Sequence, residues 1–249
     1  MTLYAWPAAT AYGRVVPKNR ILQLAKAGAA LKAHFVSDVE QIVWACKLAP
    51  ETLNLAATPA VAEIQVLRII QKRAELDPSV LQSIDRVIPF PLIFELAYDG
   101  RVRTVAAYKR PSEADSTRWV VSRHFYGSWQ AETTTRTPLP LALDLAALYE
   151  HLLRPLLDEQ IAALTGALPS REMPGAYTVG TPAAGRLSLE QRIALGDAIA
   201  ASRKAVQRIE ARLGREKQFN RRVAINAELR DAKQQLQRLI AQQAAAANL

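Results

Sequence analysis

The last quarter of the chain carries the pattern that most restricts its fold. Between residues 187 and 243 there is no proline, and apolar residues recur at helical spacing in two narrow seams separated by the polar run 214–220. A helix with so narrow an apolar stripe must bury that stripe against another helix. We therefore predict a basic antiparallel helical hairpin (coiled coil) over residues 187–249, with Phe219 filling the bend; a single long helix that self-associates is the alternative.

This tail also holds most of the net charge. Residues 186–249 contain 13 of the 32 Lys and Arg residues but 6 of the 23 Asp and Glu residues, and so carry +7 of the net +9. Basic residues near the bend would bind phosphate groups, or they would simply keep a coiled-coil flank solvated. The residues expected to bind nucleic acid here are Arg212, Arg215, Lys217, Arg221 and Arg222. The residues expected to bind a partner protein are Ile199, Val206, Ile209, Phe219, Leu229 and Leu236.

The preceding residues predict an α+β domain. Asp99 and Gly100 separate two β-rich runs, 92–98 and 101–108, which is the strongest short-range signal for a hairpin. Residues 118–126 predict a third strand, and the expected fold is a small antiparallel sheet with helices packed on one face. Further strands are expected over residues 47–55 and 133–137, and helices over 17–35, 61–73, 78–87 and 139–164, while 39–44 fits either element.

Domain limits follow from a change in composition. Residues 165–185 are rich in proline and glycine and poor in apolar residues, which is typical of a linker. We expect an α+β domain over 1–164, a linker over 165–186 and the hairpin over 187–249. No run approaches the roughly 18 apolar residues of a membrane span, and no signal peptide is recognisable, so we expect a cytoplasmic protein.

Signatures of catalysis are absent from the sequence. It contains no phosphate-binding glycine loop, dinucleotide fingerprint or serine nucleophile elbow. His34, His124 and His151 lack metal-ligand spacing, and the single cysteine, Cys46, has no recognisable base beside it. We therefore predict no metal, no cofactor and a non-catalytic protein.

An unusual metal-dependent nuclease is one alternative. Acidic residues on a strand followed by a lysine can hold Mg²⁺ and orient water, and Glu95, Asp99 and Lys109 follow that order on neighbouring strands. The position two before this lysine, where such a core needs an acid, is Ala107. The pattern for a nuclease is thus incomplete.

A nucleic-acid-binding module is a second alternative. The third strand mixes basic and aromatic residues, which on an exposed sheet could contact phosphates and stack on bases. Half of any such strand can instead face the core, so simple packing also accounts for its aromatic residues. The candidate nucleic-acid-binding residues of this strand are Arg118, Trp119, Arg123 and Tyr126.

Several segments carry a family resemblance. They are KLAPETLNL, EIQVLRIIQKRAELD, IDRVIPFPLIF and AAYKR within residues 47–110, and EKQFNRRVAINAEL in the tail. These segments resemble the bacterial family called domain of unknown function 4391. The resemblance implies an accessory subunit encoded beside a helicase and a DNA methyltransferase in antiviral defence or restriction-modification loci. It implies docking of a helicase or methyltransferase subunit through the α+β domain and hairpin, with DNA as a further partner.

Overall fold

The computed structural model describes residues 3–112, 114–115, 118–166 and 187–247. The chain divides into two compact units, Met1–Gln160 and Ile161–Leu249, each described separately below. Most of the expected linker, 165–186, lies outside the described residues. Within the described ranges, no helix is long and apolar enough to cross a membrane.

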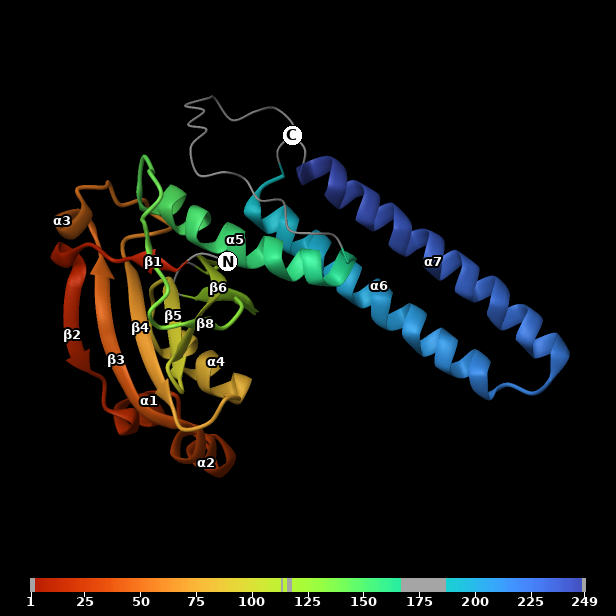
Figure 1. Ribbon diagram of the computed structural model, residues 1–249, viewed down its shortest axis with the longest axis horizontal. Helices are drawn as coiled ribbons and strands as arrows, with labels where there is room; N and C mark the ends of the chain where they lie inside the picture. Colours follow the sequence, from red (N-terminus) through yellow and green to blue (C-terminus); the bar gives the residue numbers. More distant parts are fainter. Residues whose placement is uncertain (1–2, 113, 116–117, 167–186, 248–249) are drawn as a thin grey trace. The chain divides into compact units, whose positions relative to one another are not determined.

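A mixed sheet forms the centre of the first unit (Figure 1). Its strands pair in the order β2–β3–β4–β5–β6–β7, with the short β8 also on β6, and every neighbouring pair is antiparallel except β4 with β5. The α+β class is confirmed, but the sheet is larger than the predicted small antiparallel one. The strands of this sheet are β2 (Ala11–Val15), β3 (Val39–Leu48), β4 (Ile64–Gln71), β5 (Leu92–Tyr98), β6 (Arg101–Pro111), β7 (Trp119–Tyr126) and β8 (Gln130–Ala131).

The predicted helix over 61–73 is wrong, because this segment contains strand β4. Its residues are buried on both faces of the strand, as expected where helices cover both sides of a sheet. A strand of this kind shows a continuous apolar run in place of alternation, and such a run imitates a broad helical face. The β-branched residues Ile64, Val66, Ile69 and Ile70 favour the strand.

Other predicted elements shift or divide. Residues 39–44, which fitted either a helix or a strand, belong to β3. Because β3 ends at Leu48, the strand expected over 47–55 is mostly replaced by α3 (Pro50–Leu53). The helix expected over 17–35 divides into α1 (Lys18–Leu24) and α2 (Ala29–Asp38), because Lys26 adopts a left-handed φ of 49°. The strand expected over 133–137 is reduced to β9 (Thr137–Pro138), which pairs with β1 (Tyr4–Ala5). A 3₁₀ turn, Ala8–Thr10, precedes β2.

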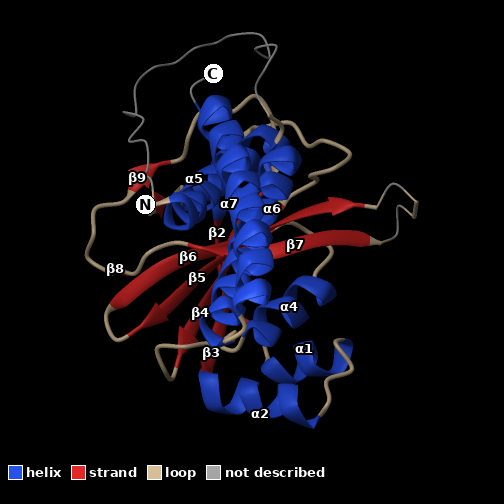
Figure 2. Cartoon of the chain, turned by 90° about the vertical axis from the view of Figure 1, so that its right-hand side faces the viewer, coloured by secondary structure: helices blue, strands red, loops and turns tan. Residues whose placement is uncertain are grey.

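Helix α4 (Pro78–Val87) provides the crossover that makes β4 and β5 parallel. It begins as predicted, with Pro78 in its first turn and the Asp77 carboxylate accepting a hydrogen bond from the Ser79 N–H at 2.9 Å. Its residues Val80, Leu81 and Ile84 are buried in one cluster with apolar residues of β4, β5 and β6. Helices α1 and α2 lie near α4 on this side of the sheet (Figure 2).

Helix α5 (Leu145–Thr165) contacts the other side of β6 and begins later than the predicted residue 139. Pro155 lies inside it without ending it. Tyr149, which is buried, donates a hydrogen bond from its hydroxyl to the Ala107 carbonyl at 2.5 Å and accepts one from the Lys109 N–H at 3.1 Å. The helix is thereby tied to the backbone of β6.

The second unit contains the predicted hairpin of α6 (Leu189–Arg215) and α7 (Phe219–Ala247), which pack together. Ion pairs between the helices join Arg212 to Glu228 and, at 2.8 Å, Lys233 to Glu210. The bend is shorter than expected. Glu216 orders it by accepting hydrogen bonds from the backbone N–H groups of Lys217 and Gln218, both at 2.9 Å. Phe219 does not fill the bend, because 78% of it is exposed.

Replacing Tyr149 with Phe tests the attachment of α5. We expect the free energy of unfolding at pH 7 to fall by about 1–2 kcal/mol, since both hydrogen bonds of the hydroxyl are lost. Urea denaturation of the variant and the wild type measures this difference. The exposed Tyr12→Phe is the control, and an equally stable Tyr149→Phe variant would contradict the assignment.

The stability difference between the wild type and the Tyr149→Phe variant should also change with pH in alkaline solution. Burial raises the pKa of Tyr149 well above its ordinary value of 10.0, so the folded state retains a proton that the unfolded chain releases. This contribution to stability is complete below pH 10 and is lost as pH rises from there toward the raised pKa. The difference in the free energy of unfolding between the wild type and Tyr149→Phe should therefore become smaller above about pH 10.

Candidate functional site

A shallow groove lies between α4 and the edge strand β7, entirely within the first unit. We call it the α4–β7 groove. One side carries polar and basic residues of α4, and the other carries aromatic and basic residues at and beside β7. Its lining residues are Pro78, Gln82, Asp85, Arg86, Arg118, Trp119, Val121, Ser122, Arg123, His124 and Tyr126.

A β-bulge determines which residues of β7 face this groove. Val121 pairs with Lys109 and His124 pairs with Ala107, so Ser122 and Arg123 together lie opposite one residue of β6. The Ser122 hydroxyl accepts a hydrogen bond from the Tyr108 N–H at 2.9 Å and completes the pairing there.

The bulge changes which side chains share a face. Strict alternation would place Trp119 and Tyr126 on opposite faces of the sheet. With one extra residue between them, Trp119 and Tyr126 instead lie opposite Pro111 and Val105, which share one face of β6. The groove therefore receives both rings.

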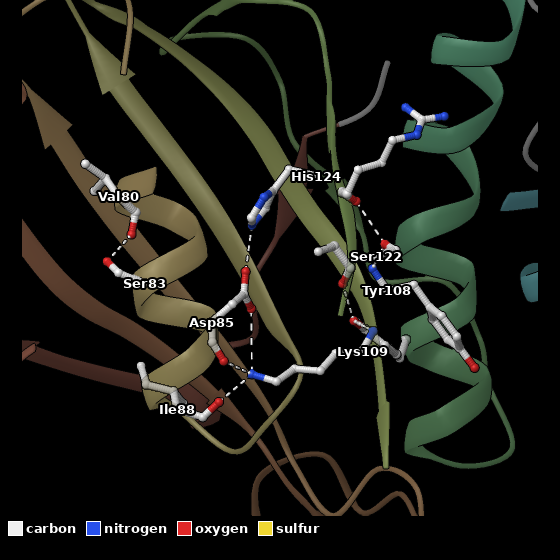
Figure 3. A network of polar contacts seen from close by, with 11 residues as sticks. Val80, Ser83, Asp85, Ile88, Tyr108, Lys109, Ser122 and His124 are labelled. Atoms are coloured by element: carbon white, nitrogen blue, oxygen red, sulfur yellow. Dashed lines mark hydrogen bonds and ion pairs between the residues drawn. The ribbon is translucent and has the colours of Figure 1, made fainter. Parts of the chain in front are cut away.

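A buried polar network forms the floor of the groove (Figure 3). Asp85 projects from α4, and its Oδ2 atom accepts a hydrogen bond from Nε2 of His124 at 2.6 Å. Its Oδ1 atom lies 3.7 Å from Nζ of Lys109. All three side chains are buried, so the charges of Asp85 and Lys109 depend on each other for compensation.

Lys109 also satisfies the end of α4. Its ammonium donates hydrogen bonds to the carbonyls of Asp85, at 2.5 Å, and Ile88. The last carbonyls of a helix have no partner within the helix, and the negative end of the helix dipole favours a cation there. Burial lowers the pKa of Lys109, while Asp85 opposes this shift by favouring the charged form.

The rim of the groove is basic. Arg118 exposes 82% of its side chain and pairs with Asp115 at 3.3 Å. Arg86 is exposed on α4. Arg123 donates a hydrogen bond to Oε1 of Gln160 at 2.5 Å, which holds its side chain at the edge of the sheet. The Arg123 guanidinium lies over the ring of Phe125, so Arg86 and Arg118 are the rim arginines with exposed side chains beside Trp119 and Tyr126.

The aromatic residues of the groove are half-buried and held in place. The guanidinium of Arg103 lies over the rings of Tyr126 and Trp129, at 5.0 and 4.5 Å from their centroids. Nζ of Lys109 lies 5.8 Å from the centre of the Trp119 ring. Burial raises the pKa of Tyr126 above its ordinary value of 10.0. The rings of Tyr126 and Trp119 each have a cation on one side, and both line the groove.

The structure brings together the four nucleic-acid-binding candidates of the third strand, since Arg118, Trp119, Arg123 and Tyr126 all line this groove. Sequence reasoning missed the contribution of α4, above all Asp85 and Arg86. The signal available for Asp85 was an acidic residue directly after Ile84 on a strongly amphipathic helix. That position alone does not identify its partners.

The three nuclease candidates do not form a common site. Glu95 lies on β5 and accepts hydrogen bonds from Trp6 at 2.8 Å and Arg136 at 2.6 Å. Asp99 lies in the turn with a left-handed φ of 48°, and Lys109 contacts Asp85. Across the described ranges, no group of three His, Cys, Asp or Glu residues could hold a metal ion.

The hairpin candidates differ in accessibility. Among the partner-binding candidates, Ile199, Val206 and Ile209 are buried, and Phe219 is exposed. Leu229 and Leu236 are half-buried. The nucleic-acid-binding candidates of the hairpin are all exposed: Arg212, Arg215, Lys217, Arg221 and Arg222. Both sets of binding roles stay predictions.

Replacing Lys109 with Met tests the floor of the groove. The variant leaves Asp85 as an uncompensated buried charge and the end of α4 without its donor, so the free energy of unfolding should fall by about 3–5 kcal/mol. Chemical denaturation measures the loss. The exposed Lys204→Met control should change stability by less than about 0.5 kcal/mol. Adding Asp85→Asn should recover part of the loss, and additive effects of the two changes would argue against direct coupling.

Comparison with known proteins assigns this chain to one family. No curated protein and no solved structure matches this chain. The family match covers residues 5–236 and therefore includes the whole α4–β7 groove and most of the hairpin. The chain belongs to the family described as domain of unknown function (DUF4391).

Proposed function

We propose that this protein is a non-catalytic accessory subunit that binds single-stranded nucleic acid in the α4–β7 groove. The observation that carries the proposal is the bulge in β7, which places Trp119 and Tyr126 on one face beside basic residues of two elements. Strand-borne aromatic side chains flanked by arginines are the usual means of holding unpaired bases and their phosphates.

The two kinds of residue would have separate tasks. The exposed guanidinium groups of Arg86 and Arg118 would contact phosphates and supply affinity that does not depend on sequence. The rings of Trp119 and Tyr126 would stack on bases. Bases within a duplex keep their faces covered by their neighbours, so rings supported on one side favour a single strand.

The aromatic content of β7 is divided between core and groove. Phe125 is buried and lies on the opposite face from His124, so it accounts for the core-packing interpretation at that position. Trp119 and Tyr126 are half-buried and line the groove. Core packing therefore accounts for Phe125, and the nucleic-acid-binding interpretation applies to Trp119 and Tyr126.

Trp119→Leu tests the stacking role. Leucine keeps an apolar group near Lys109 but cannot stack, so affinity for a labelled single-stranded oligonucleotide should fall about tenfold, within the 1–3 kcal/mol typical of one stacked base. Fluorescence anisotropy measures the dissociation constant. The control is Tyr12→Leu, which changes an exposed aromatic residue of β2 at the other end of the strand order. Equal affinities of the Trp119 variant and this control would reject the groove as the binding site.

Salt dependence tests the arginines. In the double variant Arg86→Gln and Arg118→Gln, the slope of log affinity against log salt should become shallower by about 1.4, since each phosphate contact on a single strand contributes about 0.7. A titration from low to high salt gives this slope. An unchanged slope would show that these two arginines do not contact phosphate.

The accessory role rests on the family resemblance and is compatible with the groove. Helicases and DNA methyltransferases both act on DNA, and a chain that holds an unpaired strand would supply a contact useful to either enzyme. Co-purification from the native host, with and without nuclease treatment, tests this part. A helicase or methyltransferase retained after nuclease treatment supports direct docking, and its absence under both conditions would contradict the accessory role while leaving nucleic-acid binding intact.

A further inference from the structure

The hairpin carries a second surface with basic and aromatic character, which we call the hairpin tip and define as residues 208–223. Phe219 and Val223 are 78% and 54% exposed there. They are four residues apart on α7 and so lie on neighbouring turns of one helix face. The exposed basic residues of the tip are Arg208, Arg212, Arg215, Lys217, Arg221 and Arg222.

Most of the basic charge at the tip is not neutralised. Residues 208–222 contain six basic and two acidic residues. Arg212 is paired with Glu228, and Glu210 is paired with Lys233. The remaining acid, Glu216, accepts two backbone hydrogen bonds, which lower its pKa.

The other arginines of the tip therefore depend on solvent or a ligand. Among the described residues, Arg215, Arg221 and Arg222 form no ion pair within 4 Å, although Arg221 lies near enough to Glu216 to lower its pKa. Arg208, Arg212 and Arg215 line one hollow on α6, together with Ala211 and Glu216. This part of the surface favours an anionic ligand.

Phe219 is not needed to close the hairpin. The seam is already buried at Val206, Ile209 and Ile225. An exposed aromatic ring among cations that outnumber the nearby acids suits a ligand that offers both negative charge and flat apolar faces. Nucleic acid combines phosphates with bases, whereas a protein partner would need an acidic surface around an apolar pocket.

We propose that the hairpin tip is a second nucleic-acid site, in which arginines contact phosphates and Phe219 stacks on an unpaired base. The inference deepens the proposed function and rests on it for the class of ligand. Phosphate contacts by Arg215, Arg221 and Arg222 hold any nucleic acid, and the ring selects strands or junctions with an accessible base. The tip lies in the second unit, so its contribution is measured separately from that of the groove.

The test uses the full chain and two probes, a labelled single-stranded oligonucleotide and a blunt duplex of the same sequence. Phe219→Ala should weaken single-strand binding at least fivefold and leave duplex binding unchanged. The triple variant Arg215→Gln, Arg221→Gln and Arg222→Gln should weaken binding of both probes at least tenfold at low salt. Circular dichroism should show the wild-type helical signal, because all four side chains are exposed.

Matched controls remove similar groups elsewhere. Leu143→Ala removes an apolar side chain that is 91% exposed. The triple change of Arg20, Arg101 and Arg230 to Gln removes the same charge from exposed positions outside the groove and the tip. Affinity changes equal to those of the tip variants would show that only net charge or exposed apolar area matters, and would overturn the inference.

The variants distinguish an error in the tip inference from an error in the groove proposal. If Trp119→Leu weakens binding and the tip variants do not, the tip inference is wrong and the groove stands. If only the tip variants weaken binding, the groove is rejected and the tip stands. If Phe219→Ala leaves both affinities unchanged but removes a co-purifying protein, the tip is a protein-docking surface and the inference is overturned.

Discussion

The α4–β7 groove depends on the buried ammonium group of Lys109. It contacts the carbonyls of Asp85 and Ile88 at the end of α4 and compensates the Asp85 carboxylate, which in turn holds His124. Helix α4 is the crossover between the two parallel strands, so its end must be satisfied close to the sheet. Lys109 does this from β6, the strand that pairs with β5. The hydrogen bond between Asp85 and His124 then joins α4 to β7, the two walls of the groove.

The stretch 107–109 of β6 is held from both faces. On one face, the side chain of Lys109 binds α4. On the other, the hydroxyl of Tyr149 from α5 binds the Ala107 carbonyl and the Lys109 N–H. Its neighbour β7 carries its bulge opposite this stretch. A bulge disturbs the ladder and increases the local twist, so firm anchoring of the adjacent strand allows it to re-aim side chains without loosening the sheet edge.

Two surfaces of the protein combine arginines with accessible aromatic rings: the α4–β7 groove in the first unit and the hairpin tip in the second. They are built differently. In the groove, half-buried rings are supported from below by Lys109 and Arg103, which favours a defined binding geometry. At the tip, Phe219 is exposed on a helix end, which favours contacts of lower precision. The family match includes both surfaces.

The sequence by itself determined the features that depend on neighbouring residues. These are the hairpin of α6 and α7, the Asp99–Gly100 turn and the start of α4 at Pro78. Local patterns also indicated the basic and aromatic residues of β7. Tertiary structure decided what depends on distant residues. Burial on both faces made 64–71 a strand, and the bulge moved Trp119 onto the face of Tyr126. Pairing of Asp85 with His124 and Lys109 joins three separate elements, and no local period encodes such an encounter.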